Sequence, residues 1–315
     1  MIAVTGEALI DLVAGQDGHI TARPGGGPFN TARTLGRLGL SPAFLGRLSA
    51  DRFGRLLRAT LDADGVSLAV PGAASVPTTL AVADVDPAGS ARYLFYTEGT
   101  SVPALDYPAL AGALPAGLTA LYAGGVALAT EPVATSIARV VASDLPPGVL
   151  LMVDPNCRPE VVTDRRGYLA RLSAILRRAD VAKVSVEDLD YLSPGSPAPA
   201  AAAALLGQGP ALVLLTDGPR PARAFLPDEV VSADVPAVAV ADTVGAGDAF
   251  GGAFLAWWTS AGLGRNDLFD RPALAEALAA AIEVASITCQ RVGADPPRLA
   301  ELTAAGSAWR GRRGG

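Results

Sequence analysis

Short apolar runs alternate along this chain with longer segments in which apolar residues recur every three or four positions. The short runs have the length and the Val, Leu and Ala content of buried strands, and the periodic segments have the spacing of amphipathic helices. Because most predicted strands are followed by a helical segment, the pattern predicts a mainly parallel sheet covered by helices on both faces. The predicted strands span residues 2–9, 43–48, 121–124, 149–153, 181–184 and 211–215, and the first two predicted helices span residues 29–38 and 51–63.

Two stretches interrupt this alternation, at residues 12–23 and 78–98, and both have the pattern of paired strands. In the second stretch, two strand-like segments flank the turn sequence Asp-Pro-Ala-Gly at 86–89. Antiparallel pairs within a chain of alternating strands and helices predict a small sheet that projects from the main domain. The Ala- and Pro-rich stretch 193–204 is short and further strands follow it, so we interpret it as a surface loop and a helix. The sequence therefore predicts one α/β domain over residues 1–315.

The composition is that of a folded protein with a large core, because 50% of the 315 residues are hydrophobic and 18% are charged. The net charge of −6 gives no overall positive field, so we expect neither nucleic acid nor an anionic membrane as a partner. No uncharged apolar run reaches the roughly 18 residues of a membrane helix, and the first residues lack a basic segment and a signal cleavage site. The two cysteines provide no disulfide framework. These features predict a cytoplasmic protein.

Two residue types are so rare that they exclude whole classes of site. His19 is the only histidine and lies in a segment typical of a solvated turn, so catalytic triads and multi-histidine metal sites are not favoured. Lys183 is the only lysine, and no Gly-x-x-x-x-Gly-Lys-Ser/Thr motif surrounds it, which excludes a P-loop nucleotide site.

The strongest local signal is the segment 242–252, Asp-Thr-Val-Gly-Ala-Gly-Asp-Ala-Phe-Gly-Gly, in which a polar glycine-rich turn leads directly into an apolar helix. Free N–H groups at a helix start, together with the helix dipole, form an anion site, and glycines let a phosphate approach the backbone. Asp248 is either a carboxylate that complements the helix dipole or a general base beside a bound phosphate. The glycines also resemble a dinucleotide fingerprint, but too few residues follow for a complete NAD domain.

Two further candidate sites lie where predicted strands end, which is where open α/β sheets bind ligands. At the first, Glu7 and Asp11 flank the end of the first predicted strand, and the glycine run 25–27 leads through Asn30 into the first predicted helix. Asp11 and Asn30 offer hydrogen-bonding groups suited to sugar hydroxyls. A helix cap and an ordinary flexible loop are the alternatives there. At the second, the segment 154–159, Asp-Pro-Asn-Cys-Arg-Pro, includes Arg158. Its planar guanidinium group can donate two hydrogen bonds at once to an oxyanion or to a pair of hydroxyls. The alternative is a turn followed by a solvated arginine.

The motifs GGGPFNTA, DPNCRP and DTVGAGDAF, in this order and at these separations, closely resemble those of the ribokinase-like (PfkB) carbohydrate kinases. The resemblance covers essentially the whole chain, and GEALIDL, GRLSADRFG and DPNCRP look most like the bacterial fructokinase branch. It implies a three-layer α/β/α domain with a predominantly parallel central sheet and a small projecting β-sheet, the lid, formed by 12–23 and 78–98. The implied reaction transfers the γ-phosphoryl group of ATP to a primary hydroxyl of a hexose, most of all fructose, to give fructose 6-phosphate.

The same resemblance implies roles for individual residues. Asp248 would be the general base that accepts the hydroxyl proton. The amides of Gly245, Ala246 and Gly247 would hold the charge that develops on the transferred phosphoryl group. The residues that would bind the sugar, two of them from the lid, are Asp11, Gly26, Gly27, Asn30, Tyr93, Phe95 and Arg158.

The implied nucleotide site is a less complete match to the family. Ser185, Thr216 and Gly218 would bind the nucleotide together with Gly245 and Gly247. The loop that follows Thr216 lacks the second glycine that is common in the family, so this part of the site departs from the pattern.

The implied ion sites also depart from the family pattern. Members often carry Asn-x-x-Glu, which supports Mg²⁺ through water, whereas the matching residues 185–188 are Ser-Val-Glu-Asp. The role then falls to Asp188, with Glu187 as the neighbour that can take it instead. Asp242 and the carbonyl of Val244 would form a site for a monovalent cation such as K⁺. The implied cofactors are therefore ATP and Mg²⁺, with K⁺ as an addition.

Several alternatives remain open at this stage. A 2-keto-3-deoxygluconate kinase needs a cation for the carboxylate of its substrate. Its lid strand typically ends in Tyr-Arg, whereas this chain has Tyr-Thr-Glu at 96–98, and only Arg92 could compensate. Ribokinase and nucleoside kinase activities rank lower, because DPNCRP is typical of hexose kinases. A catalytically silent sugar-binding regulatory protein is disfavoured, because Asp248 and its neighbouring glycines are present.

Two expectations concern the surface. Relatives often pair through their lids, and the apolar run 80–83 would allow a homodimer. The C-terminal segment 309–315, rich in Arg and Gly, is expected to be a solvated end.

Overall fold

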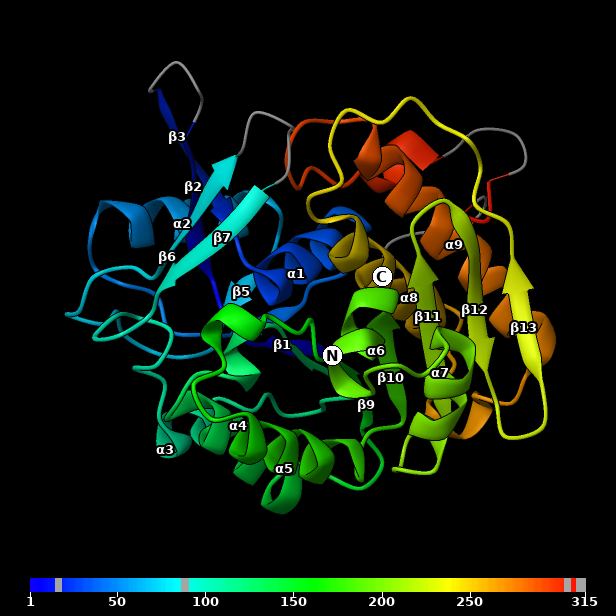
Figure 1. Cartoon of the computed structure of the whole chain (residues 1–315). Coiled ribbons are helices and arrows are strands. Elements are labelled where there is room, and N and C mark those ends of the chain that lie inside the picture. The colour runs from blue at the N-terminus through cyan, green and yellow to red at the C-terminus, as the bar shows by residue number, and fades with distance from the viewer. Residues whose placement is uncertain (15–18, 86–90, 303–306, 310–315) are drawn as a thin grey trace.

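The computed structural model describes residues 1–14, 19–85, 91–302 and 307–309, which form two sheets with flanking helices (Figure 1). In these residues the larger sheet has nine strands, in the order β13–β12–β11–β10–β9–β8–β1–β4–β5. Neighbouring strands from β5 to β11 are parallel, whereas β12 and β13 are antiparallel additions at one edge. The strands are β1 Ile2–Thr5, β4 Ala43–Leu45, β5 Ser67–Leu68, β8 Ala120–Gly124, β9 Leu150–Asp154, β10 Val181–Ser185, β11 Leu212–Asp217, β12 Arg220–Phe225 and β13 Val230–Ala233.

Helices cover both faces of this sheet, and each face has its own buried apolar cluster. On one face lie α1 Gly27–Arg37, α2 Arg52–Ala63, α8 Ala246–Ser260 and α9 Arg271–Cys289. On the other lie α3 Tyr107–Gly112, α4 Val133–Ser143, α5 Arg165–Leu176, α6 Val186–Leu192 and α7 Ala198–Leu206. Short 3-10 turns are η1 Val126–Leu128, η2 Pro159–Val161, η3 Arg265–Asp267 and η4 Leu299–Leu302. Successive strand residues join opposite clusters, Tyr122 the first and Leu121 the second, so the predicted three-layer arrangement is confirmed.

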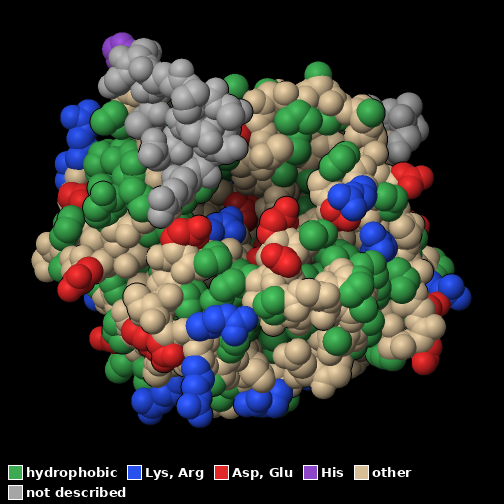
Figure 2. Space-filling model, in the orientation of Figure 1, with side chains coloured by type: hydrophobic (Ala, Val, Ile, Leu, Met, Phe, Trp, Pro, Cys, Tyr) green, Lys and Arg blue, Asp and Glu red, His purple; other side chains and the backbone are tan. Residues whose placement is uncertain are grey.

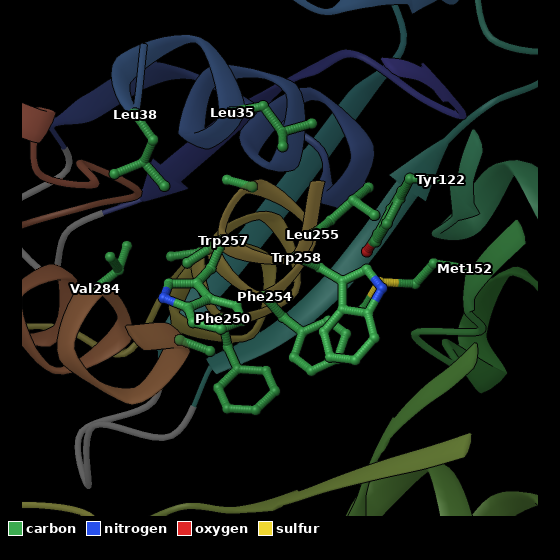
Figure 3. Close-up of a cluster of buried hydrophobic side chains, with 14 of the residues drawn as sticks. Leu35, Leu38, Tyr122, Met152, Phe250, Phe254, Leu255, Trp257, Trp258 and Val284 are labelled. Atoms are coloured by element: carbon green, nitrogen blue, oxygen red, sulfur yellow. The ribbon is translucent and has the colours of Figure 1, made fainter. Parts of the chain in front are cut away.

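Helix α8 runs through the middle of the first apolar layer, and every residue from Asp248 to Trp258 is buried. Figure 3 shows its aromatic side chains in this cluster, where the rings of Phe254 and Trp258 stack with centroids 5.7 Å apart. The indole N–H of Trp258 donates to the carbonyl of Gly264 at 3.0 Å, which satisfies its polar atom. Because the helix is surrounded by protein, its first turn lies inside the molecule rather than at the outer surface.

The smaller sheet is the lid, and its strand order is β3–β2–β6–β7. Strands β2 and β6 pair in parallel, and each of them pairs with its outer neighbour in the antiparallel sense. Figure 1 shows this sheet beside the large one, at the upper left of the view. The predicted projecting strand pairs at 12–23 and 78–98 are therefore confirmed, with bounds β2 Leu9–Ala14, β3 Ile20–Gly25, β6 Leu80–Val85 and β7 Ala91–Tyr96.

The predicted strand at 2–9 is wrong in its extent. The chain leaves the large sheet after Thr5 and enters the lid at Leu9. Gly6 between them has φ +148°, and a Cβ there would lie 2.2 Å from Cγ of Pro28. The turn therefore requires glycine, and it carries the chain from one sheet to the other past the start of α1.

The expectation of a solvated C-terminal end changes at Trp309. Trp309 is not solvated, because its side chain is 3% exposed and its indole N–H donates to the carbonyl of Ala280 at 3.2 Å. Residues 310–315 lie outside the described residues. Helix α9 is the one helix of the described ranges that is long and apolar enough to cross a membrane, but half of its apolar window is buried and its inner residues belong to the core cluster around α8.

Candidate active site

A cavity of about 890 Å³ lies beside the carboxyl ends of the parallel strands, between the large sheet and the lid. Figure 2 shows this face of the molecule hollowed near its centre, with acidic and basic side chains beside the hollow. Of the residues to which the family resemblance assigned a catalytic, substrate, nucleotide or ion role, only Asp242 is missing from the described lining. The others that line it are Asp11, Gly26, Gly27, Asn30, Tyr93, Phe95, Arg158, Ser185, Glu187, Asp188, Thr216, Gly218, Val244, Gly245, Ala246, Gly247 and Asp248.

The start of α8 forms part of the cavity wall. Gly245 is the N-cap and has the left-handed conformation φ +78°, and a Cβ there would lie 2.5 Å from Cβ of Ala294. Its glycine is therefore required by both conformation and space. The amide of Ala246 donates to the carbonyl of Thr243 at 3.2 Å. The next amides, beginning with Gly247, belong to the first helical turn, which has no intrahelical acceptors and suits an anion.

Asp248 lies in that first turn with its side chain directed at α1. Its Oδ2 accepts a hydrogen bond from Nδ2 of Asn30 at 2.9 Å, and the residue is 7% exposed. Burial raises the pKa of Asp248 to about 6, although the bond from Asn30 and the charge of Lys183 oppose the rise. A carboxylate held near neutral pKa in a cavity is suited to act as a general base.

Asn30 does not have the capping role that was the alternative for it. The N-cap of α1 is Gly26, and Asn30 lies within the helix. Its Nδ2 holds Asp248, while its Oδ1 is buried and has no hydrogen-bond partner in the described protein. A buried oxygen without a partner is costly, so this atom is placed to accept a hydrogen bond from a ligand in the cavity.

The lid contributes a carboxylate and two aromatic side chains to the cavity. Asp11 of β2 lies directly opposite Arg23 of β3 in the strand register. Burial and the charge of Asp248 raise the pKa of Asp11 to about 7, whereas Arg158 and Arg23 oppose the rise. On β7, the rings of Tyr93 and Phe95 stack with centroids 6.2 Å apart. These groups combine hydrogen-bonding atoms with an apolar wall, as sugar sites do.

Gly27 leaves space in the cavity between the side chains of Asn156 and Asp248. A Cβ at this position would lie 2.9 Å from Nδ2 of Asn156 and 3.1 Å from Oδ1 of Asp248. Any larger residue would therefore fill the gap in front of the proposed base. Asn156 itself has a positive φ of 41° and its amide donates to Oδ1 of Asp154 at 3.2 Å, which turns its side chain into the cavity lining.

Glu7 is a buried site residue to which the sequence analysis assigned no role. It is 3% exposed, and its Oε1 and Oε2 accept hydrogen bonds from the amides of Gly27 at 3.0 Å and Ala127 at 3.2 Å. Burial raises the pKa of Glu7 to about 7 despite these bonds. Glu7 lies just after β1, where ligands bind in such folds, and this position was the sequence feature that could have indicated its part in the site.

Lys183 is the second missed residue. Its Nζ donates to Oδ2 of Asp154 at 2.7 Å, and the two side chains are 5% and 0% exposed. A Cβ on Gly247 would lie 3.0 Å from the same Nζ, so this cation faces the start of α8. Burial alone would lower the pKa of Lys183, but the charges of Asp154 and Asp188 raise it. Its being the only lysine, within a predicted strand, was the signal that could have found it.

Asp188 lies at the cavity, but its carboxylate is already engaged by the protein. It accepts hydrogen bonds from the amide and the hydroxyl of Ser185, both at 2.8 Å, and from the amide of Cys157 at 2.6 Å. This capping box starts α6 and ties it to the loop after β9. About one of its four lone-pair sites remains for water. Glu187 beside it is exposed and also lines the cavity.

Asp242 holds the backbone of two segments together. Its Oδ1 accepts from the amide of Val244 at 3.0 Å, and its Oδ2 accepts from the amide of Gly293 at 2.8 Å. In the described residues no group of three His, Cys, Asp or Glu side chains could hold a metal ion. Asp188 and the exposed Glu187 line the cavity with carboxylate oxygens, which are ligands that suit the Mg²⁺ ion implied by the sequence.

Comparison with known protein families matches residues 1–300 to the family described as pfkB family carbohydrate kinase. The chain belongs to this family. It is 34% identical to a fructokinase of Rhizobium leguminosarum bv. trifolii over 264 residues, which cover 81% of this chain and 79% of that protein. It is 30% identical to a probable fructokinase-5 of Arabidopsis thaliana over 307 residues, which cover 94% and 93%.

Solved structures of this family have the same fold. A fructokinase double mutant from Vibrio cholerae O395, with fructose, ADP and potassium ion bound, matches with a TM-score of 0.81 and 26% identity over 93% of each chain. A fructokinase from Xylella fastidiosa with bound ATP matches with a TM-score of 0.80 and 26% identity, again over 93% of each chain. The predicted family, its fructokinase branch and its fold are confirmed, and the protein is a carbohydrate kinase.

The buried pair in this kinase gives a testable prediction about stability. Lys183→Met leaves Asp154 buried without its cation, so we expect it to lower the free energy of unfolding by about 3–5 kcal/mol. Adding Asp154→Asn removes the unpaired charge, and the double variant should cost clearly less than the two single changes together. Urea unfolding of all four proteins measures this coupling. As a control, Arg220→Met breaks a pair with Asp217 in which the arginine side chain is 73% exposed, so it should leave stability close to that of the wild type. Additive costs at 154 and 183 would contradict the ion pair.

Proposed function

We propose that this carbohydrate kinase is an ATP-dependent fructokinase that phosphorylates the 6-hydroxyl of fructose. The observation that carries the proposal is the buried carboxylate of Asp248 in the first turn of α8, held by Asn30 at 2.9 Å with its pKa raised to about 6. The fructokinases among its relatives and structural neighbours support the choice of sugar.

In this proposal, Asp248 accepts the proton of the attacking hydroxyl. The amides of Gly245, Ala246 and Gly247, at the positive end of the α8 dipole, stabilise the charge on the transferred phosphoryl group. The amide of Ala246 donates to Thr243 here and would have to exchange that partner. Lys183 adds a fixed positive charge beside Gly247, which offsets the repulsion between Asp248 and an incoming phosphate.

We assign the sugar to the lid side of the cavity. Asp11, the unpartnered Oδ1 of Asn30 and Arg158 would bind its hydroxyls, and Gly26 and Gly27 leave it room. Tyr93 and Phe95 would cover its apolar face. The lid strand ends in Tyr-Thr-Glu at 96–98, without the arginine that is typical of 2-keto-3-deoxygluconate kinases, and this favours fructose. Arg158 and Arg23 lie near Asp11 and oppose the rise in its pKa, and the side chain of Arg92 lies outside the described residues.

We assign the nucleotide to the other end of the cavity. Ser185, Thr216 and Gly218 lie there at the ends of β10 and β11, and apolar residues beyond them, including Val238 and Ile282, offer a surface for a base. Mg²⁺, when bound, would neutralise phosphate charge, with Asp188 or the exposed Glu187 holding its water. For a monovalent cation such as K⁺ we assign Asp242 and the carbonyl of Val244.

The proposal extends to the organisation of the chain. One kinase domain over residues 1–315, with the lid inserted in it, accounts for a cavity lined from both sheets. A cytoplasmic location agrees with the availability of ATP there and with the burial of half of the apolar window of α9 in the core.

The substrate assignment is tested by following ADP release with Mg-ATP across fructose, ribose, 2-keto-3-deoxygluconate, tagatose and a nucleoside. We expect clear preference for fructose, and preference for another sugar would overturn the assignment.

In Asp248→Asn protein, kcat should fall by roughly 10²- to 10⁴-fold, because the base acts mainly in the transition state. The affinity for fructose should be retained, which calorimetry measures. Activity within tenfold of the wild type would contradict the role of Asp248.

A further prediction concerns the pH dependence of the kinase activity. Burial raises the pKa of Asp248 from 3.8 to about 6, so the base becomes protonated, and inactive, as the pH falls through that value. We expect kcat at saturating fructose to fall about tenfold per pH unit below this value. We choose kcat because the pKa of Asp11, which we assign to sugar binding, is raised to about 7 and would add its own pH dependence to kcat/KM. The residual activity of Asp248→Asn should lack this limb. A limb near pH 4 in the wild type would show that the carboxylate is not raised.

We also propose that the outer face of the lid binds the lid of a second copy of this chain. This face carries the row Leu12–Val82–Leu94 and the exposed ring of Tyr96, on the side opposite to Phe95 and the cavity. Leu94 and Tyr96 are 44% and 58% exposed, which is unusual for large apolar side chains that are adjacent in space.

Leu94→Glu should therefore shift the protein from dimer to monomer in sedimentation velocity, because a charge would be buried at the interface. Phe269→Glu, which places the same charge at an equally exposed apolar residue outside the lid, should leave the dimer intact. A monomeric wild type at tens of micromolar would reject the lid dimer.

A further inference from the structure

A buried carboxylate away from the cavity binds three arginines. Asp64 caps the C-terminus of α2, and its side chain is 2% exposed. It accepts hydrogen bonds from Nε of Arg33, Nε of Arg37 and Nη2 of Arg298, each at 2.9 Å. The first two arginines lie on α1, and their side chains are only 9% and 12% exposed. One carboxylate cannot balance three guanidinium groups, so the arginines must have further partners.

The further partners of Arg33 and Arg37 lie on one loop, residues 293–296, that follows α9. Nη1 of Arg33 donates to the carbonyl of Ala294 at 2.9 Å. Nη1 of Arg37 donates to Oδ1 of Asp295 at 2.5 Å and to the carbonyl of Pro296 at 2.6 Å. The loop belongs to no strand or helix, and besides these side-chain bonds its backbone has a bond from the amide of Asp295 to the carbonyl of Gly293 at 2.9 Å and one from Arg291 to the carbonyl of Asp295 at 3.4 Å. The bonds from Arg33 and Arg37 therefore supply a large part of what holds the loop in place.

The opposite side of the same loop supports the start of α8. The amide of Gly293 donates to Asp242 at 2.8 Å, and Ala294 packs so closely on Gly245 that a Cβ on that glycine would lie 2.5 Å from it. The lid reaches the loop as well, because a Cβ on Gly293 would lie 3.2 Å from Nη1 of Arg23. A displacement of this loop would therefore change the turn that presents the first amides of α8.

We propose that Asp64 and its three arginines are positioning residues for catalysis, which hold loop 293–296 against Gly245 and so fix the turn that binds the transferred phosphoryl group. The inference rests on the function proposed for that turn. None of the four residues lines the cavity in the described chain, so they act through the loop and not by touching substrate. The role predicts an effect on kcat that exceeds the effect on substrate binding.

A second buried cluster provides the matched control. Asp180 has a side chain that is 6% exposed and pairs with Arg178 at 3.2 Å and Arg265 at 2.9 Å. It also accepts from the amide of Leu151 at 2.7 Å. It lies just before β10, at the end of the strand away from the cavity. Asp180→Asn therefore breaks a comparable cluster without affecting the loop.

The experiment compares Asp64→Asn with Asp180→Asn at a temperature at which both remain folded by circular dichroism. Both should lower Tm. Only Asp64→Asn should lower kcat for fructose, by about 10- to 100-fold, because small displacements of positioned groups are that costly, while KM changes less than threefold. Deuterium exchange of the amides in 242–250 and 291–298 should rise in Asp64→Asn and stay unchanged in Asp180→Asn.

Arg37→Lys decides the case if Asp64→Asn does not fold. It keeps the charge but cannot hold Asp64, Asp295 and Pro296 together, so it should show the same selective loss in kcat, to a smaller extent. A kcat within twofold of the wild type in the folded variant, or equal exchange at 242–250, would overturn the proposal. Wild-type protein without any kinase activity would reject the proposed function instead. The comparison of deuterium exchange would then still test whether Asp64 and its three arginines hold loop 293–296.

Discussion

A helix that runs through the middle of a hydrophobic core must begin inside the protein, and α8 begins at the wall of the cavity. The first-turn amides of any helix have no intrahelical acceptors, and burying them without partners is costly. The fold resolves this conflict by opening the cavity at that point, which leaves the buried helix end accessible for the anion that we propose it binds. Gly245 permits the sharp entry into the helix, and the apolar residues up to Trp258 anchor the rest of it.

The same burial sets the chemistry of the charged groups. Glu7, Asp11 and Asp248 all have pKa values raised by loss of water, the first two to about 7 and the third to about 6. The carboxylates near the cavity outnumber its buried cations, of which Lys183 is the most enclosed. Hydrogen bonds such as that from Asn30 keep the rise at Asp248 modest. The site therefore holds a carboxylate that is ionised at neutral pH yet basic enough to accept a proton.

The segments that build the site come from distant parts of the chain and are held by polar contacts between them. Asn30 on α1 reaches Asp248 on α8, and Lys183 on β10 reaches Asp154 at the end of β9. Asp188 joins the start of α6 to the loop at Cys157. Each contact pairs a buried polar atom, so the loss of one leaves a partner unsatisfied in a place that water reaches poorly. On the remaining side, Asp11 and Phe95 of the lid line the cavity.

Much of this could be predicted from the sequence, because local patterns specify local structure. The periodicity predicted the alternating strands and helices, the two lid strand pairs and the apolar helix after Asp248, and the motifs indicated the family. The break at Gly6 was missed, because an apolar run does not show where a chain changes sheets. The roles of Lys183 and Glu7 were missed for a related reason. The role of a charged residue in an apolar segment depends on which residues are its neighbours in space.

The sequence by itself determined the order of the elements, the family and the residue types available for chemistry. Only the tertiary structure decided which of them meet. Asp154 could not be distinguished from a turn residue until Lys183 lay 2.7 Å away, and Asp64 had no evident role until arginines separated from it by up to 234 positions surrounded it. The physical reason is that charge pairing, desolvation and close packing depend on distance in space, which hydrophobic periodicity and local motifs do not record.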